Sequence, residues 1–346
     1  MSPQESDGTP LPTAPLSGVM IAGTGSAVPK RLVTNTDLEQ IMDTSNEWII
    51  KRTGIRERHI HDREAGETTS TMATEAAQRA IEAAGISAAD LDMVICGTMT
   101  PDMPTPSVAC IIADRLGTGQ IAAFDLNAAC SGFVYALNAA HALMIGGPYR
   151  SCLVIGADSV TRYCDFSTFG RAVAVLFGDG AGACVLRKTD DTTKGLITQC
   201  MHSDGGGAKH LYIPTRKGDF YDQSEFDEQQ VNHILMHGPG VFKFAVSTFP
   251  KLIAQTLDEA GLNPEDVDHY VCHQSNARIL NAARDRFGLP EDKLYVNIDR
   301  FGNTVAASVP LILDQQTRAG NIKPGQKVMF LAFGAGLTWA SSLWQL

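Results

Sequence analysis

The chain has 346 residues, of which 44% are hydrophobic and 19% are charged, and its formal net charge at pH 7 is −10. This composition is typical of a globular protein with one large or two medium domains. The acidic balance argues against nucleic acid as the main partner.

The sequence also argues against membrane insertion, secretion and metal binding. No apolar run reaches the roughly 18 residues of a membrane span, and no basic segment followed by an apolar stretch opens the chain. The eight cysteines form no CxxC pair, and several lie within apolar runs. Reduced thiols fit this pattern better than a disulfide or zinc framework. We therefore expect a cytoplasmic protein without a metal site or a membrane span.

Residues 1–17 contain four prolines among Ser, Thr and Gly, which predicts a disordered tail. From Val19 onward, short apolar runs alternate with helical patterns. Because apolar strands between helices are usually buried on both faces, the pattern predicts an α/β fold with a parallel or mixed sheet. The predicted strands are 19–23, 93–96, 121–126, 152–156, 172–177 and 181–186, and the predicted helices are 69–84 and 107–116, with a capping box at 36–39.

One cysteine lies where a buried strand gives way to a helix. The apolar run 121–126 precedes Cys130, and Phe133 opens a helical pattern that ends at Gly146. At a helix N-terminus, unpaired N–H groups and the positive end of the dipole favour an anion, so we predict a nucleophile with thiolate character. Gly132 allows another group to approach closely. The alternative is a small buried cysteine that only fills space.

The sequence contains an internal repeat. Segments 84–96 and 260–272 share Ala, Gly, two Asp and Cys at matching positions, and each predicts a helix end, a glycine stop, a capped turn and a strand. Segments 177–182 and 333–337 are a second, glycine-rich pair in the same order. Two pairs of similar segments in the same order favour an internal duplication over coincidence. The predicted parts are the tail 1–17, a first half 18–194 and a second half 195–346.

The second half carries further candidates for chemistry. His273 follows a predicted strand at its C-terminal end, where open α/β folds place their sites, and the matching residue in the first half is Gly97. Asn303 lies in a turn, and 333–339 offers backbone N–H groups suited to an oxyanion hole. Each could instead be structural: a hydrogen-bonded histidine, a turn residue or a packing corner. Segment 204–229 has no clear period and is predicted to be an ordered surface excursion beside a site.

Several specific motifs occur together, in one order, over nearly the whole chain. Because of these motifs, the chain from about Val19 to Leu346 resembles the β-ketoacyl-acyl-carrier-protein synthase III family of the thiolase-like superfamily. The motifs are DTSNEW at 43–48, RTGIRER at 52–58, ACSG at 129–132, FGDGAG at 177–182, HQSN at 273–276, GNT at 302–304 and the terminal glycine-rich turn. The resemblance implies a duplicated five-layer α/β/α/β/α fold and a homodimer.

The resemblance also assigns roles residue by residue. It implies a catalytic triad of Cys130, His273 and Asn303. It also implies an oxyanion hole made by the backbone N–H groups of Cys130 and Ala335. The substrates would be acyl-CoA and malonyl-carrier protein, with no cofactor and no metal. Thr105 would belong to the acyl pocket of the partner subunit. The implied coenzyme A contacts are Thr44, Trp48, Arg52, Arg171, Phe242 and Asn276, and the implied carrier-protein contacts are Gln274, Ser275, Asn276, Ala277 and Arg278.

The implied reaction is a ping-pong condensation. Cys130 takes an acyl group from acyl-CoA, malonyl-carrier protein then loses carbon dioxide, and the carbanion attacks the acyl-cysteine. His273 and Asn303 would stabilise the enolate, and an amide such as Asn303 cannot protonate the carbanion. The product, a 3-oxoacyl-carrier protein, would initiate fatty-acid synthesis. A carrier-binding relative without catalysis is disfavoured by the intact triad, and a thiolase or an HMG-CoA synthase is disfavoured by Asn303.

Two departures from the family pattern matter. Thr105 stands where relatives often have a bulky aromatic residue, so we expect a primer longer or bulkier than acetyl. Segment 165–171 is longer than the usual loop, which leaves the role of Arg171 least secure. A related condensing enzyme of a specialised pathway, such as polyketide starter chemistry, stays open as the alternative because its triad would look the same.

Overall fold

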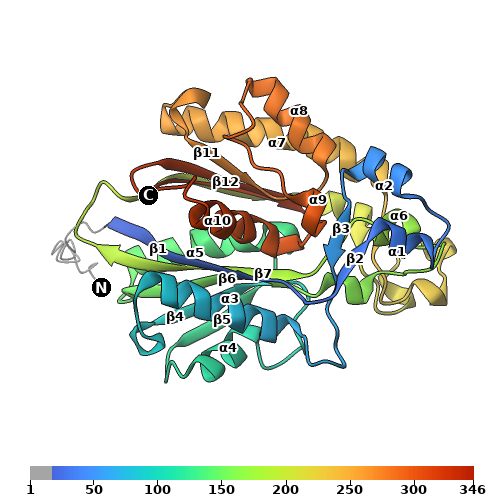
Figure 1. The fold of residues 1–346 in the computed structure, drawn as a ribbon, viewed down its shortest axis with the longest axis horizontal. Coiled ribbons are helices and arrows are strands. Elements are labelled where there is room, and N and C mark those ends of the chain that lie inside the picture. The colour runs from blue at the N-terminus through green and yellow to red at the C-terminus, as the bar shows by residue number, and fades with distance from the viewer. Residues whose placement is uncertain (1–17) are drawn as a thin grey trace, which may run out of the picture.

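The computed structural model describes residues 18–346, which form five layers (Figure 1). The predicted five-layer fold is therefore confirmed, whereas the predicted tail, residues 1–17, lies outside the described residues. From one outer face to the other, the layers are helices α3 (Thr69–Ala84) and α4 (Val108–Leu116), a five-stranded sheet, helices α5 (Gly132–Gly146) and α10 (Ser308–Arg318), a four-stranded sheet, and helices α7 (Gly238–Ala260) and α8 (Ala277–Phe287).

The five-stranded sheet is mixed. Its order is β1 (Gly18–Ala27), β7 (Gly180–Thr189), β6 (Ser151–Asp158), β4 (Met93–Gly97) and β5 (Ala122–Leu126). Strand β4 runs parallel to both of its neighbours, whereas β7 runs antiparallel to β1 and β6. Because β5 is an edge strand, no strand within residues 18–346 pairs with its outer side.

The four-stranded sheet has the order β11 (His269–Cys272), β12 (Lys327–Gly334), β13 (Thr338–Gln345) and β8 (Gly195–Ser203). Strands β11 and β12 are parallel, and the other two pairs are antiparallel. The C-terminal ends of β5, β6, β11 and β12 thus open toward the region between the two sheets, where Cys130, His273 and Asn303 lie.

The repeated segments have the same local structure. Gly85 and Gly261 both end a helix in the left-handed conformation, with φ of 64° and 65°. A 3-10 turn with a capping box follows each one, and then a buried strand, β4 or β11. Glycine adopts this backbone conformation without the steric cost of a Cβ atom. The boundary between the halves at residues 194 and 195 stays a prediction.

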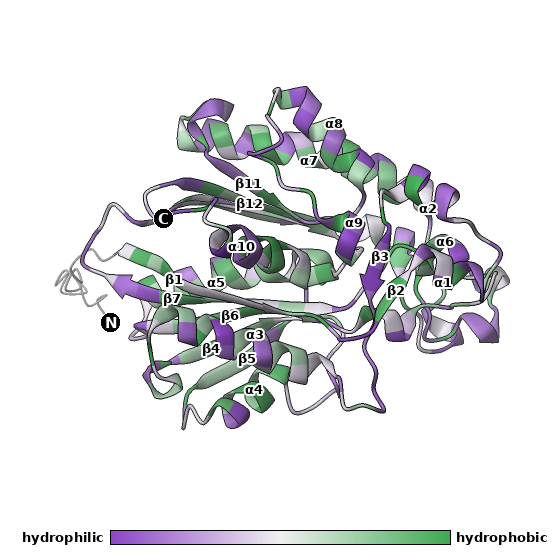
Figure 2. Cartoon of the chain, in the orientation of Figure 1, coloured by the Kyte–Doolittle hydropathy of each residue, from purple (hydrophilic) through white to green (hydrophobic). Residues whose placement is uncertain are grey.

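Helix α5 forms the centre of the core. Among residues 18–346, one helical window, Ala129–Gly146, is long and apolar enough to cross a membrane by length and composition, and 61% of it is buried inside the protein. Phe133 and Leu137 of this helix pack against Val154 of one sheet and Phe330 of the other. A helix that is apolar on all sides suits such a position between two sheets. The outer helices α3, α4 and α8 instead carry hydrophilic residues on their outward sides (Figure 2).

Smaller elements surround the site. They are α1 (Asn35–Glu39), α2 (Asn46–Thr53), α6 (Arg171–Ala174), α9 (Ile298–Phe301), β2 (Leu32–Thr34), β3 (Glu57–His59), β9 (Leu211–Tyr212) and β10 (Leu235–Met236).

Two local predictions were wrong. The run 172–177 is not a strand, because its first residues belong to the short helix α6, and periodicity cannot distinguish a short buried strand from a short helix. The capping box lies at Thr34 and Asp37 rather than at 36–39, since Thr34 has the extended conformation that an N-cap needs and exchanges both hydrogen bonds with Asp37.

Candidate active site

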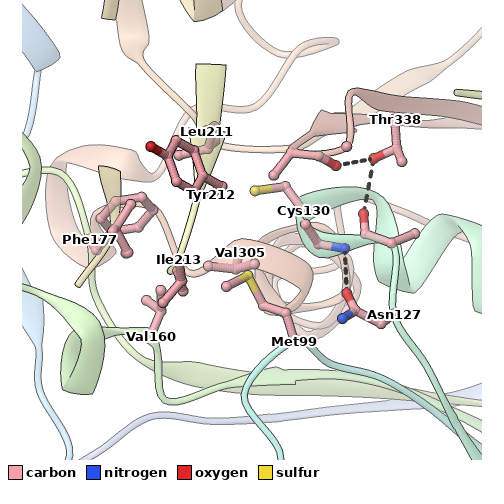
Figure 3. A pocket seen from close by; sticks show the side chains of 15 residues that line it. Met99, Asn127, Cys130, Val160, Phe177, Leu211, Tyr212, Ile213, Val305 and Thr338 are labelled. Carbon is pink, nitrogen blue, oxygen red and sulfur yellow. Dashed lines mark hydrogen bonds between the residues drawn. The ribbon is translucent and has the colours of Figure 1, made fainter. Parts of the chain in front are cut away.

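Two cavities meet at Cys130. The larger one, of about 1010 Å³, is lined by Cys130, His273 and Asn303 and extends past Trp48 and Arg52. The smaller one, of about 410 Å³, lies beyond Cys130 (Figure 3). Leu211 and Phe177 line both cavities together with Cys130, so an acyl group on the sulfur could enter the smaller space while the larger space admits its carrier.

The backbone around Cys130 is tightly constrained. Ala129 has a φ of +46°, a conformation that non-glycine residues rarely adopt and that often marks functional sites. Cys130 follows it within a 3-10 turn, Ala129–Ser131, that leads into α5. At the end of β12, a Cβ atom on Gly334 would lie 2.7 Å from the Cβ of Cys130. Only glycine therefore allows β12 to approach Cys130 so closely.

The pKa of Cys130 departs from the sequence-based expectation. Burial raises the pKa of its thiol to about 12, and the negative charge of Asp158 adds to this effect. The backbone N–H groups of Cys130 and Ala335 act in the opposite direction, but burial dominates. The predicted thiolate character in the resting enzyme was therefore wrong. The two N–H groups are the ones that the resemblance assigns to an oxyanion hole.

His273 is uncharged at neutral pH. It follows β11, is fully buried, and has a pKa lowered to about 3, chiefly by burial. Its Nδ1 lies 2.7 Å from the hydroxyl oxygen of Ser308. Its ring meets Phe333 edge to face, with ring centroids 5.7 Å apart. The packing and the Ser308 contact together fix the orientation of the imidazole.

Asn303 is held by backbone contacts. Its N–H donates to the carbonyl of Leu176, and its own carbonyl accepts from the N–H of Gly178. The side-chain Oδ1 accepts a hydrogen bond of 2.9 Å from the N–H of Val305. Because the oxygen is used in this way, the Nδ2 hydrogens are the donors that the amide offers to the cavity it lines.

Most residues assigned to coenzyme A lie along the larger cavity. Trp48, Arg52, Phe242 and Asn276 line it, and the guanidinium carbon of Arg52 lies 4.6 Å from the centroid of the Trp48 ring. Asn276 also donates to the carbonyl of Arg52 over 3.0 Å. These side chains offer a flat aromatic surface and positive charge at the cavity mouth, which suits a nucleotide.

Arg171 and Thr44 are placed less directly. The guanidinium carbon of Arg171 lies 5.7 Å from the Trp48 ring, and this side chain forms an ion pair of 2.9 Å with Asp43. Thr44 does not line the cavity, and its buried hydroxyl has no hydrogen-bond partner within residues 18–346. The structure thus brings Arg171 next to the Trp48 ring, whereas Thr44 lines neither cavity.

Segment 274–278, which the resemblance assigns to carrier-protein binding, is buried at its start and exposed at its end. Gln274 is fully buried, and its side-chain amide binds backbone groups of Cys272, Tyr295 and Asn297. Gln274 therefore shapes the segment from inside, and the surface is formed by the part that follows. Ser275, Asn276 and Ala277 are half-buried, and Arg278 is exposed.

The smaller cavity contains residues that sequence reasoning missed. Met99, Val160, Ile213 and Ile234 give it an apolar lining. Figure 3 shows the sulfur of Cys130 directed toward the space beside Leu211 and Tyr212. The role of these lining residues depends on contacts between distant segments, which no spacing reveals. The one available signal was the predicted surface excursion 204–229, which supplies Ile213 and its neighbours.

Thr105 lies outside both cavities of its own chain. It is exposed in the loop before α4 and lines neither space. Within residues 18–346, no group of three His, Cys, Asp or Glu side chains is arranged to hold a metal ion.

The raised pKa of Cys130 generates a prediction about pH. Because the thiol is the dominant form well above neutrality, the thiolate fraction in the free enzyme should rise roughly tenfold per pH unit. We expect the rate of Cys130 alkylation by iodoacetamide to follow that slope from pH 6 to pH 9 without a plateau. Peptide mass spectrometry measures it, with the exposed Cys110 as an internal reference. A plateau below pH 8 would contradict the prediction.

Comparison with known proteins places the chain in one family. The family described as 3-Oxoacyl-[acyl-carrier-protein (ACP)] synthase III matches residues 124–205, and its C-terminal part matches residues 257–346. A β-ketoacyl-[acyl-carrier-protein] synthase III from Caldanaerobacter subterraneus is 46% identical over 323 residues, which cover 93% of this chain and 96% of the relative.

Solved structures agree. The 3-oxoacyl-[acyl-carrier-protein] synthase III of Aquifex aeolicus has a TM-score of 0.87 and 38% identity, covering 95% of this chain and all of that one. The priming β-ketosynthase of the R1128 polyketide biosynthetic pathway has a TM-score of 0.88 and 35% identity, covering 97% and 98%. The chain therefore belongs to the 3-oxoacyl-acyl-carrier-protein synthase III family of thiolase-like acyltransferases.

Proposed function

We propose that this enzyme joins an acyl-CoA primer to malonyl-carrier protein by decarboxylative condensation, with Cys130, His273 and Asn303 as its catalytic residues. The main support is that all three, from distant parts of the chain, line one cavity. That cavity reaches an aromatic and basic mouth formed by Trp48 and Arg52. The reaction uses no redox step, so it needs no cofactor besides its two substrates, and a cytoplasmic location would give access to both.

The first half-reaction transfers the acyl group to sulfur. The sulfur of Cys130 attacks the thioester carbon of acyl-CoA and gives up its proton. The bond from that carbon to the sulfur of coenzyme A breaks, and coenzyme A leaves as a thiol that carries the proton. Negative charge develops on the thioester oxygen, where the backbone N–H groups of Cys130 and Ala335 would receive it. Because the pKa of the free thiol is high, forming the sulfur nucleophile costs free energy. Backbone N–H groups that stabilise negative charge on the sulfur and on the thioester oxygen would lower the barrier to acyl transfer. The acyl chain then occupies the smaller, apolar cavity.

The second half-reaction forms the carbon–carbon bond. Malonyl-carrier protein enters the larger cavity, and loss of carbon dioxide leaves an enolate whose oxygen faces His273 and Asn303. The Ser308 hydroxyl, which lies 2.7 Å from Nδ1 of His273, donates to the carbonyl of Val305 at 3.0 Å. For neutral His273 to donate from Nε2, this hydroxyl turns and donates to Nδ1 instead. Asn303 donates from Nδ2. The carbanion then attacks the acyl-cysteine and releases the sulfur. Both donors bind the enolate oxygen rather than the carbon, which keeps the carbanion available for attack.

Separate assays of the two half-reactions test the catalytic assignment. We expect His273→Ala and Asn303→Ala each to lower malonyl decarboxylation about 10²–10³-fold, because each removes a donor to the enolate. Acylation of Cys130 by acyl-CoA, followed by intact-protein mass, should persist in both.

The control is His269→Ala, which removes another histidine of β11 whose ring instead contacts Tyr295 and Gln326. If either catalytic variant condensed at the wild-type rate, the assignment would be wrong.

A specialised pathway is the second candidate. It is favoured by one observation, namely the TM-score of 0.88 to the priming β-ketosynthase of a polyketide pathway. The chemistry at Cys130 would be the same in either case. A panel of acyl-CoA primers with malonyl-carrier proteins from fatty-acid and polyketide systems separates the two, because the preferred carrier identifies the pathway.

The carrier protein would dock beside the mouth of the larger cavity. Carrier proteins are acidic, and this chain has a net charge of −10, so docking requires a local basic surface. Arg278 is exposed at the start of α8, and its guanidinium carbon lies 5.4 Å from the ring of Phe242 at the mouth. Arg284 on the same helix is already paired with Glu291. Arg278 is therefore the strongest candidate contact.

Charge reversal tests this docking site. We expect Arg278→Glu to raise the KM for malonyl-carrier protein roughly tenfold, equivalent to about 1.4 kcal/mol, because a favourable charge contact becomes repulsive. Acylation of Cys130 by a short acyl-CoA should stay close to the wild-type rate. Arg187→Glu on β7 makes the same charge change on a different element. Equal losses in both half-reactions, or equal effects of both variants, would refute the docking site.

Primer selection would involve a second subunit. Strand β5 presents an unpaired edge with an exposed Phe124, and such an edge can pair with a second copy in a homodimer. In that arrangement Thr105 would reach the partner subunit's smaller cavity, as the family resemblance implies. A short side chain there leaves room in the 410 Å³ space, so the proposed primer is longer or bulkier than acetyl.

A primer series tests the pocket. We expect the wild-type enzyme to prefer acyl-CoAs longer than two carbons, and Thr105→Phe to shift the preference toward acetyl by filling the space. The measurement is the rate of Cys130 acylation across saturated acyl-CoAs. Thr192→Phe, in the turn between β7 and β8, controls for an added aromatic ring. A sharp wild-type optimum at two carbons would end the proposal.

A further inference from the structure

A buried carboxylate of the first half contacts the segment that follows Asn303. Asp158 is the last residue of β6 and is fully buried. Its Oδ2 accepts a hydrogen bond of 3.0 Å from the backbone N–H of Ala306. The two backbones are close at this point, because a Cβ atom on Gly156 would collide with the carbonyl oxygen of Ala306. The contact therefore joins the two halves of the chain beside the catalytic residues.

The other carboxylate oxygen of Asp158, Oδ1, is bound by residues of the loop after β4, next to the smaller cavity. Oδ1 accepts from the N–H of Met99 at 2.9 Å and from the hydroxyls of Thr100 and Thr98 at 2.8 Å and 3.1 Å. Met99 lines the smaller cavity. Within residues 18–346, no Lys or Arg forms an ion pair with Asp158. A fully buried carboxylate without a cation is costly, and here four donors offset that cost.

The segment that Asp158 holds orients both catalytic donors. It is the turn Val305–Ser308, in which the N–H of Val305 binds Oδ1 of Asn303 and the hydroxyl of Ser308 contacts Nδ1 of His273. Val305 has a φ of +52°, which costs a β-branched residue about 1–3 kcal/mol. Such a conformation persists only where surrounding contacts enforce it. The hydrogen bond from Ala306 to Asp158 is a contact of this kind at the next residue.

We propose that Asp158 is a positioning residue for the condensation step, which anchors the turn Val305–Ser308 through the Ala306 N–H and thereby aims Asn303 and His273 at the malonyl thioester. The inference rests on the proposed function. Asp158 does not line either cavity, so it acts through the turn rather than on the substrate. Its contact with Met99 also ties the acyl cavity to the same anchor.

The carboxylate affects the two half-reactions in opposite ways. Its negative charge disfavours the Cys130 thiolate, so it opposes the first half-reaction. Its hydrogen bond to Ala306 supports the donors of the second half-reaction. Removing the charge should therefore make Cys130 more reactive and condensation slower. General damage to the site would instead lower both.

The variant Asp158→Asn keeps the shape and removes the charge. It also places an amide N–H₂ group against N–H and hydroxyl donors, which disturbs the anchor. We expect kcat for condensation to fall about 10- to 100-fold with little change in the KM for malonyl-carrier protein, less than the roughly 10²–10³-fold cost of deleting a donor outright. Alkylation of Cys130 by iodoacetamide at pH 7 should become faster. Thermal unfolding of each variant confirms that it folds.

Asp92→Asn is the matched control. Asp92 precedes β4 and accepts two backbone N–H groups, from Arg150 and Ser151, at 2.7 Å and 3.0 Å. It thus makes the same type of contact in the same sheet without touching the turn. We expect neither half-reaction to change in this variant by more than about twofold, as is usual for sites distant from the chemistry.

A second variant removes only the donor. Replacing the amide at Ala306 by an ester, through incorporation of lactic acid, deletes the N–H and leaves Asp158 charged. Condensation should fall as in Asp158→Asn, whereas Cys130 alkylation should stay at the wild-type rate. This variant decides the question if Asp158→Asn does not fold.

Distinct outcomes separate the inference from the proposed function. A wild-type enzyme that is acylated but does not condense with malonyl-carrier protein would overturn the proposed function. A competent wild-type enzyme whose folded Asp158→Asn variant condenses within twofold of the wild-type rate would overturn the positioning role alone. Equal slowing of alkylation and condensation in that variant would also overturn it, since it would indicate general damage.

Discussion

Close approach of backbones at the centre of the molecule is the constraint on which the site depends. A Cβ atom on Gly97 would lie 2.5 Å from the carbonyl carbon of Gly132, and one on Gly334 would lie 2.7 Å from the Cβ of Cys130. These glycines let strands of both sheets contact the turn before α5 directly. Side-chain contacts alone would separate the layers by about 10 Å. Groups from the two halves can therefore share one cavity.

The same closeness buries the side chains of Cys130 and His273 and keeps them uncharged. Burial raises the pKa of the Cys130 thiol and lowers the pKa of His273, so both groups are neutral at rest. In the proposed reaction, negative charge develops in the cavity first on sulfur and then on the thioester oxygens. Fixed dipoles suit this situation, because N–H donors stabilise a transient anion without requiring a permanent counter-ion. A local helix dipole is a small effect beside burial, so the pKa of the Cys130 thiol is raised rather than lowered.

Local patterns predicted much of the fold and some of the site. Helix stops at Gly85 and Gly261 could be identified because glycine in the left-handed conformation has a sequence signature. Cys130 and His273 were predicted as site residues because each follows a predicted strand. The strand before Cys130, β5, was expected to be buried but is a half-exposed edge strand, whereas β11 before His273 is buried. Met99 and Asp158 could not be identified, since their roles come from contacts with residues far away in the chain. The run 172–177 was misassigned because four residues of helix and a short strand have the same apolar composition.

The buried carboxylate of Asp158 has an unfavourable electrostatic effect on the Cys130 thiol, yet it fits its own surroundings. Its charge raises the pKa of the nucleophile, and burial raises its own pKa to about 6, so the group is unfavourable in both respects. A neutral hydrogen-bonding residue would relieve both effects. A carboxylate, however, can accept four hydrogen bonds at once, whereas an amide must also donate. The geometry around Ala306 and Met99 presents only donors, so a carboxylate alone matches it. In the proposed mechanism, orientation of His273 and Asn303 outweighs the penalty to the thiol. Condensation would need both donors in place, whereas acylation would draw on the separate backbone N–H groups at Cys130 and Ala335.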